Sequence, residues 1–121
     1  MVENQTATYK IAVASGDGIV VNQHFGKADT FHIYELEESG SSRLLESRTV
    51  TPVCNGGNHD DRQLRDNIDI LKDCKYVLVS RIGAGAATVM EQSGIIPMEL
   101  PDMIEEAIHK VITYDQIQNL F

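Results

Sequence analysis

The first half of the chain has short apolar and β-branched runs separated by glycine- and serine-rich turns. The run at 9–15 is almost wholly apolar, which predicts a strand in the centre of a sheet. The runs at 31–37 and 43–50 predict two further strands, and 19–21 predicts a short one. A helical turn is expected at 26–29. The first half should therefore form a β-meander.

The second half alternates amphipathic helices with apolar strands. Asp60 or Asp61 can cap a helix with an apolar stripe of Leu64, Ile68 and Leu71. Cys74 is expected at the end of this helix as a core thiol. Strands are predicted at 76–80 and 95–99, and between them an alanine-rich helix at 83–93 that ends at Gly94.

Two capping boxes are predicted near the C-terminus. Asp102 with Glu105 should begin one helix, and Thr113 with Gln116 should begin a last short one. The predicted order is β-β-β-α-β-α-β-α, which indicates a three-layer α/β domain with one mixed sheet flanked by helices on both faces. We expect a single domain at 9–121, after a polar tail at 1–8.

Composition narrows the classes of function. Eighteen acidic and ten basic residues give a net charge of −8, which disfavours binding to nucleic acid or to anionic membranes. The polar start lacks the apolar stretch of a signal peptide, and no apolar run approaches the roughly 20 residues needed to cross a bilayer. We therefore expect a cytoplasmic protein.

Two cysteines, Cys54 and Cys74, are present. A disulfide between them is not expected in the cytoplasm. Two thiols also cannot supply the four-cysteine ligand set of a permanent iron–sulfur cluster. Any metal bound here must therefore use few protein ligands.

Three loops contain candidate binding residues. In the first, Asn22 and Gln23 precede His24 and Gly26. A neutral imidazole on a loop is a good ligand for iron, zinc or copper, and glycine lets the backbone approach a ligand closely. The alternative is a loop histidine that only hydrogen-bonds to its neighbours.

The second loop runs over 51–60 and contains Cys54, Gly56, Gly57 and His59. A thiol and an imidazole five positions apart can reach the same metal, although this is not a complete zinc site. The alternative is a glycine-rich connector with an unreactive thiol.

The third loop, at 80–88, contains Gly83 and Gly85 between a strand and a helix. Close strand-to-helix packing is the simpler interpretation of these glycines. Anion binding at the helix N-terminus, in support of a cofactor, is the alternative.

The segment at 11–35 closely resembles the dinitrogenase iron–molybdenum cofactor biosynthesis family, which includes the NifX and NafY carriers and the C-terminal domain of NifB. The resemblance is carried by the sequence NQHFG at 22–26 and by Phe31 with the strand IYE at 33–35. The later segments VCNGG at 53–57 and IGAGA at 82–86 resemble the family's cysteine–glycine loop and glycine turn. The likeness extends over most of the chain, from Tyr9 to Val111.

The resemblance implies a ribonuclease H-like fold that binds the nitrogenase iron–molybdenum cofactor, its iron–sulfur precursor or a related cluster. It implies that His24 and Cys54 are the metal ligands. Lys27 stands where nitrogenase-associated members often have histidine. The radical-SAM portion that makes NifB catalytic is absent from this sequence, so no catalytic residues are expected.

The leading hypothesis is therefore a non-enzymatic carrier that holds its cluster transiently. Its partners would be the donor and acceptor proteins of cofactor assembly, and it would be a monomer or a weak homodimer. The cluster would contact the loop residues Asn22, Gly26, Gly56, Gly57, His59, Gly83 and Gly85 as well as the two ligands. A metal-free regulatory or protein-interaction module and a metal-dependent hydrolase are the alternatives.

Overall fold

The computed structural model describes residues 7–55, 58–59 and 61–120. The expected polar tail lies mostly outside this range, as do Gly56, Gly57, Phe121 and the possible helix cap Asp60. No helix within the described part of the chain is both long and apolar enough to span a membrane.

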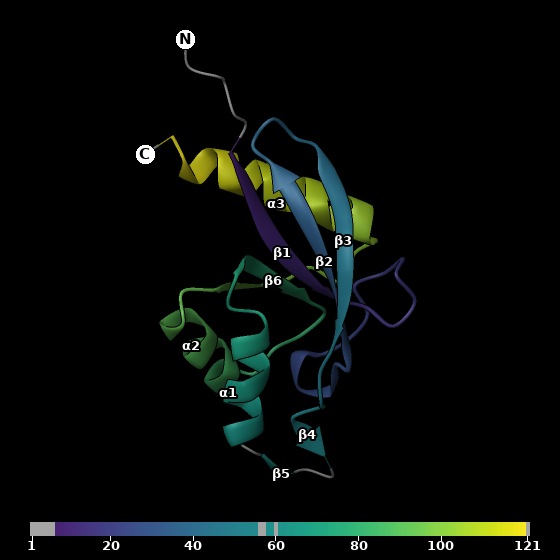
Figure 1. Ribbon diagram of the computed structural model, residues 1–121, viewed down its shortest axis with the longest axis vertical. Coiled ribbons are helices and arrows are strands. Elements are labelled where there is room, and N and C mark those ends of the chain that lie inside the picture. The colour runs from purple at the N-terminus through teal and green to yellow at the C-terminus, as the bar shows by residue number, and fades with distance from the viewer. Residues whose placement is uncertain (1–6, 56–57, 60, 121) are drawn as a thin grey trace.

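A five-stranded mixed sheet forms the middle layer of the molecule (Figure 1). The first three strands form the predicted meander, with β1 antiparallel to β2 and β2 antiparallel to β3. The later strands are parallel: β6 pairs with β1, and β7 pairs with β6. The spatial order is β3-β2-β1-β6-β7, with bounds β1 Thr8–Ala14, β2 Thr30–Glu37, β3 Ser42–Thr49, β6 Cys74–Val79 and β7 Ile96–Glu99.

Helices cover both faces of the sheet, as predicted. Helices α1 (Asp61–Ile70) and α2 (Ala84–Gln92) lie on one face, and α3 (Ile104–Gln118) lies on the other (Figure 1). The three-layer α/β architecture is thus confirmed.

Strand β1 is buried on both faces, which explains its nearly continuous apolar sequence. Ala12 and Ala14 belong to the core under α1 and α2, whereas Ile11 and Val13 belong to the core under α3. All four side chains are completely buried. Alternate residues of a strand face opposite sides, so one strand contributes to both hydrophobic cores.

The short strand expected at 19–21 does not form. Val20 makes only an isolated bridge with Met103, and Ile19 is 57% exposed. The Asp17 carboxylate explains this, because its Oδ1 accepts hydrogen bonds from the backbone N–H groups of Ile19 and Val20 at 2.8 and 3.0 Å. Those N–H groups serve a local side-chain turn and not a strand ladder. Bonding to these N–H groups also lowers the pKa of Asp17.

Two smaller elements differ from the sequence prediction. The helical turn is a 3₁₀ helix, η1, at Phe25–Lys27, one residue earlier than expected. The loop after β3 contains a short hairpin that was not predicted, formed by β4 (Cys54–Asn55) and β5 (Asn58–His59).

The C-terminal region is one continuous helix, so both predicted capping boxes are wrong. Helix α3 begins after Met103, and no side chain caps it. Asp102 instead accepts an ion-paired hydrogen bond from Lys110 at 2.8 Å. The helix does not end before Thr113, because its buried face continues to Asp115. The Asp115 carboxylate accepts a hydrogen bond of 2.7 Å from the hydroxyl of Tyr76.

Cys74 is a core thiol, as predicted, but it begins β6 and does not end α1. Helix α1 ends at Ile70, and the turn at 71–74 joins it to the strand. Burial, reinforced by the negative charge of Asp73, raises the pKa of the Cys74 thiol to about 12.

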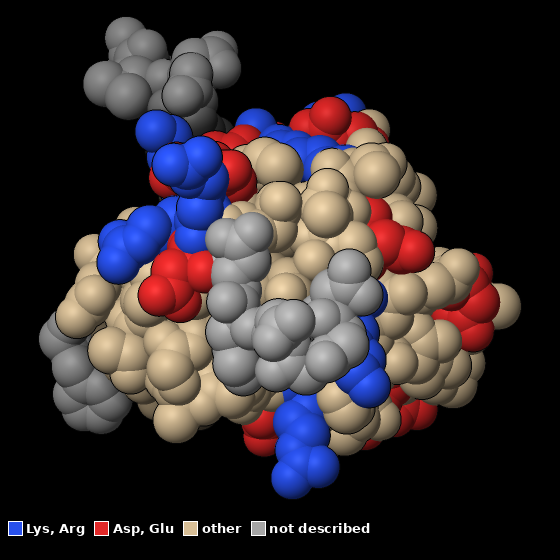
Figure 2. All heavy atoms as spheres, turned by 90° about the horizontal axis from the view of Figure 1, so that it is seen from below, with Lys and Arg blue, Asp and Glu red and all other residues tan. Residues whose placement is uncertain are grey.

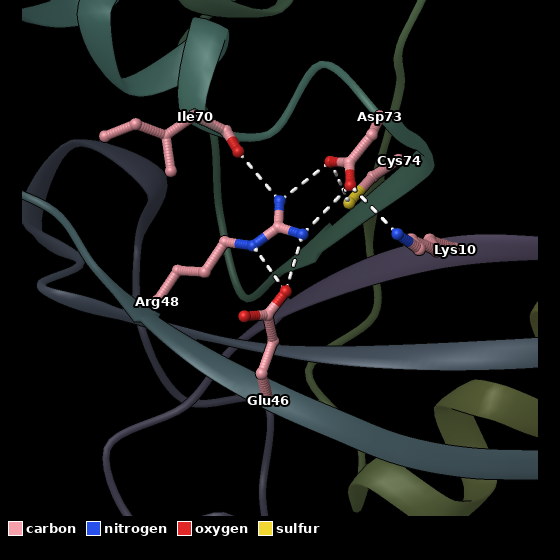
Figure 3. Close-up of polar contacts among 6 residues, drawn as sticks. All are labelled: Lys10, Glu46, Arg48, Ile70, Asp73 and Cys74. Atoms are coloured by element: carbon pink, nitrogen blue, oxygen red, sulfur yellow. Dashed lines mark hydrogen bonds and ion pairs between the residues drawn. The ribbon is translucent and has the colours of Figure 1, made fainter.

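Arg48 connects β3 to the end of α1 and the start of β6 (Figure 3). Its guanidinium binds the Asp73 carboxylate through two hydrogen bonds of 2.7 and 2.9 Å. It also donates to the backbone carbonyl of Ile70 at 2.8 Å and to the Glu46 carboxylate. Lys10 of β1 reaches the same Asp73 at 3.3 Å. With only 17% of its side chain exposed, Arg48 holds three elements together.

We expect Arg48→Met to lower the free energy of unfolding by about 2 kcal/mol, because the Asp73 carboxylate would lose two hydrogen bonds and the Ile70 carbonyl would lose its bond from Arg48. Arg43→Met is the matched control. Arg43 is 70% exposed and pairs with Glu35, so its loss should cost less than about 0.5 kcal/mol. Urea denaturation measures both values, and equal losses would contradict the bridging role of Arg48.

Because of the same network, the free energy of unfolding should depend on pH in the acidic range. Hydrogen bonding to Arg48 holds the pKa of Asp73 well below its ordinary value of 3.8. A lowered carboxyl pKa stabilises the fold fully above that ordinary value, and the stabilisation is lost as the pH falls below it. The stability difference between the wild type and Asp73→Asn should therefore shrink between pH 5 and about pH 2. A constant difference across this range, measured by urea denaturation, would argue against the ion pair.

The Cys74 thiol should be unreactive in the native protein. In a Cys54→Ala variant, which retains Cys74 as its only thiol, Ellman's reagent at pH 8 should react at least about a hundredfold more slowly than in denaturant, because burial suppresses the thiolate. Equally fast reaction in both states would show that Cys74 is accessible.

Candidate functional site

The loop that contains His24 lies against the end of β6. The backbone N–H of Ser80 donates to the carbonyl of Gln23 at 3.0 Å, and that of Phe25 donates to the carbonyl of Arg81 at 2.9 Å. His24 and Arg81 form a parallel bridge between these bonds. The His24 backbone is thus fixed beside the carboxyl end of a central strand, while its side chain stays exposed.

Phe25 anchors this loop in the core. Its ring is 2% exposed and packs against Phe31 of β2, with ring centroids 5.9 Å apart. The following 3₁₀ turn is closed by a hydrogen bond from the Lys27 N–H to the His24 carbonyl at 3.1 Å. The buried ring thus holds His24 and Gly26 at the surface on either side of it.

Asn22 supports the loop from its other end. Its Oδ1 accepts a hydrogen bond of 2.9 Å from the backbone N–H of Gly16. Asn22 thus stabilises the loop. The cofactor contact predicted for Asn22 remains a prediction.

The second predicted loop lies next to the first. Strand β4 contacts η1, and the hairpin pairs the backbone of Cys54 with that of His59 (Figure 1). Gly56 and Gly57, also predicted to contact a cofactor, lie outside the described residues.

The third predicted loop forms the N-terminus of α2. Gly83 is the N-cap residue in an extended conformation, and no side chain caps the helix. The first N–H groups of an α-helix have no acceptor within the helix, and they attract negative charge. A Cβ added at Gly83 or Gly85 would meet no described atom within 4 Å. Packing among the described residues is therefore not the reason for these glycines.

The three loops converge on two adjoining cavities. The larger has a volume of about 530 Å³ and is lined by Phe25, Gly26, Val53, Asp61, Leu64, Arg65, Gly83, Gly85, Ala86 and Val89. The smaller, of about 220 Å³, is lined by His24, Gly26, Lys27, Arg81, Ile82 and Gly83. Gly26 and Gly83 belong to both. His24 therefore opens onto the smaller cavity, and the residue before Cys54 lines the larger one.

Cationic side chains line these cavities. Lys27 and Arg81 border the smaller cavity, and Arg65 borders the larger. Figure 2 looks onto this end of the molecule and shows Lys and Arg side chains on it. Sequence reasoning missed Arg65 and Arg81 as site residues, because only the fold brings α1 and the end of β6 next to the His24 loop.

The donor set for a metal is sparse. Within the described ranges, no three His, Cys, Asp or Glu side chains gather closely enough to hold a metal ion. The ligand roles predicted for His24 and Cys54 remain predictions. The geometry offers an exposed imidazole, the first N–H groups of α2 and cationic side chains around one hollow.

Solved structures share this fold. PH0822 superimposes with a TM-score of 0.64 at 24% identity, over 87% of this chain and 89% of that one. The MJ0327 protein of Methanocaldococcus jannaschii gives a TM-score of 0.56 at 11% identity, over 89% and 91% of the two chains. At these identities the likeness concerns the fold alone.

Curated relatives are more similar in sequence. The FeMo cofactor biosynthesis protein NifB of Frankia alni is 41% identical over 84% of this chain, and that of Chlorobaculum tepidum is 40% identical over 91%. This chain matches only 20% and 25% of those two proteins. The protein NifX of Azotobacter vinelandii is 31% identical over 83% of this chain and 61% of its own length.

The model of the family described as dinitrogenase iron-molybdenum cofactor matches residues 7–114, nearly the whole length of the fold. The chain therefore belongs to this family.

Proposed function

We propose that this protein binds a metal–sulfur cluster in transit during the biosynthesis or delivery of a cofactor. The cargo is the iron–molybdenum cofactor, its iron–sulfur precursor or a related cluster. The observation that carries the proposal is the convergence of the three loops on adjoining cavities, with the exposed His24 at one of them. The family, and relatives named for FeMo cofactor biosynthesis, support it.

A small ligand set suits a cargo that must be released. Each metal–ligand bond slows dissociation, so one imidazole and one thiol hold a cluster less permanently than a four-cysteine site. We assign His24 and Cys54 as the ligands. The residues assigned to contact the rest of the cluster are Asn22, Gly26, Gly56, Gly57, His59, Gly83 and Gly85.

The proposal includes a non-catalytic role in the cytoplasm and the ribonuclease H-like classification of the fold. Donor and acceptor proteins of cofactor assembly would be its partners.

A protein-interaction module that binds no metal is the second candidate. The end of α3 and the residues just after it favour this candidate, because Tyr114 and Ile117 on the helix and Leu120 beyond it expose 40%, 46% and 78% of their surface. Large apolar side chains grouped on one surface are typical of contact sites between proteins. Cluster uptake separates the two candidates, since this module would take up none.

The central test is anaerobic reconstitution with iron and sulfide, followed by metal and sulfide analysis and visible absorption. We expect His24→Ala to lower cluster affinity by at least about tenfold, because it removes a direct ligand. Its free energy of unfolding should change by less than about 0.5 kcal/mol, because the side chain is exposed. His109→Ala is the matched control, since His109 is an exposed histidine on α3, on the other face of the sheet.

Unimpaired uptake by His24→Ala would remove His24 from its assigned role. A wild-type protein that takes up no cluster would overturn the carrier function and favour the protein-interaction module.

A further inference from the structure

Lys27, Arg65 and Arg81 are the basic residues that line the two cavities. Within the described part of the chain, none of the three forms an ion pair, and all are exposed. Elsewhere the described cations are mostly paired with carboxylates, namely Lys10, Arg43, Arg48, Lys75 and Lys110.

This arrangement stands out in a protein of net charge −8. Acidic residues outnumber basic ones almost two to one, yet these three cations at one end of the molecule make no ion pair with any residue that the structure describes. Asp61 lines the larger cavity, four residues before Arg65 on α1, and the two form no ion pair. Asp61 lies in the first turn of α1, where the positive end of the helix offsets its charge. Among the described residues that line the two cavities, three are cationic and one, Asp61, is acidic. The Glu99 carboxylate accepts a hydrogen bond of 2.9 Å from the backbone N–H of Ile82, which lines the smaller cavity.

The three cations come from separate elements. Lys27 ends η1, Arg65 lies on α1, and Arg81 follows β6. The uncapped N-terminus of α2 lies between the two cavities through Gly83. Positive charge thus reaches the hollow from several sides, as binding of a compact anion requires.

We infer that Lys27, Arg65 and Arg81 recognise the negative charge of an anionic metal–sulfide cargo. This inference rests on the proposed function and assigns it three residues beyond the predicted ligands. Ammonium and guanidinium groups pair with sulfide anions and do not coordinate the metal. Their electrostatic attraction for the anion adds affinity and speeds association, and dissolved salt weakens this attraction by screening it. Such binding retains the cargo without the slow release of additional metal–ligand bonds.

Tetrathiomolybdate, a coloured metal–sulfide dianion, serves as the probe. Its dissociation constant is measured anaerobically for the full chain and for the variants Lys27→Gln, Arg65→Gln and Arg81→Gln. Each substitution should weaken binding about three- to tenfold at low salt, and the triple variant should lose more than any single one. Because exposed side chains are replaced, the unfolding midpoints should stay close to that of the wild type.

Lys72→Gln is the matched control. Lys72 is also exposed and makes no ion pair among the described residues, but it follows the opposite end of α1 from Asp61 and lines neither cavity. The Lys72→Gln substitution removes the same unit of charge as each cavity variant. Because Lys72 lines neither cavity, this variant should bind the dianion within about twofold of the wild type. Raising the salt concentration should weaken wild-type binding more than binding by the triple variant.

The inference is overturned if the cavity variants and Lys72→Gln behave alike, or if the wild type does not bind the dianion. Molybdate, the oxygen analogue with the same charge, separates this inference from the carrier proposal. Equal binding of both anions, with the same dependence on the three cations, would uphold the charge recognition and count against a preference for sulfide. Iron–sulfide uptake that is abolished by His24→Ala but unaffected by the triple variant would uphold the carrier and overturn the charge recognition.

Discussion

The parallel pairing of β1 with β6 is the constraint on which the rest of the structure depends. It buries β1 between two hydrophobic cores and places the carboxyl end of β6 beside the loop at 22–27. In α/β sheets, ligands commonly bind outside the carboxyl ends of parallel strands, where the following helices begin. Here the His24 loop, Arg81 and the N-terminus of α2 meet at that place. The position of the candidate site therefore follows from the topology of the sheet.

Stability and the candidate site use different ends of the molecule. The Arg48 network ties β3 to the C-terminal end of α1 and the start of β6, whereas the cavities lie at the N-terminal ends of α1 and α2. The loop at 22–27 beside the cavities is held in place chiefly by hydrogen bonds of its backbone and by the buried ring of Phe25. This division lets the residues of the candidate site stay exposed without a large loss of stability. Ligand-binding loops commonly belong to the less stable parts of a fold.

The regular elements were predictable because their sequence periods are strong. The apolar runs at 9–15 and 31–37 and the amphipathic stripe beginning at Leu64 correspond to β1, β2 and α1. The errors came from polar side chains with more than one available partner. Asp17 bonds the N–H groups that a strand at 19–21 would have used, and Asp102 pairs with Lys110 and does not cap α3. The local sequence does not reveal which of these partners is bound.

The loops of the candidate site were predictable from the sequence, but two of the residues that line its cavities were not. Glycines near a histidine and a cysteine marked three loops, and the fold places the described parts of these loops around adjoining cavities. Arg65 and Arg81 gave no comparable signal, since a single arginine on an amphipathic helix or after a strand has the pattern of an ordinary surface residue. Only the contact between distant segments shows that they surround the same hollow.

The open space at Gly83 and Gly85 connects these observations. Neither glycine is required by packing among the described residues or by a positive φ angle, so these two constraints do not account for the absence of a side chain there. The proposed cargo would account for it, because a residue without a Cβ lets a ligand approach the first N–H groups of a helix closely. Lys27 and Arg81, which make no ion pair with any described residue, line the cavity beside the same turn, where they would face the negative charge of the inferred cargo. The open first turn of α2 and the cations are thus two separate observations that support the proposed anionic cargo in the same hollow.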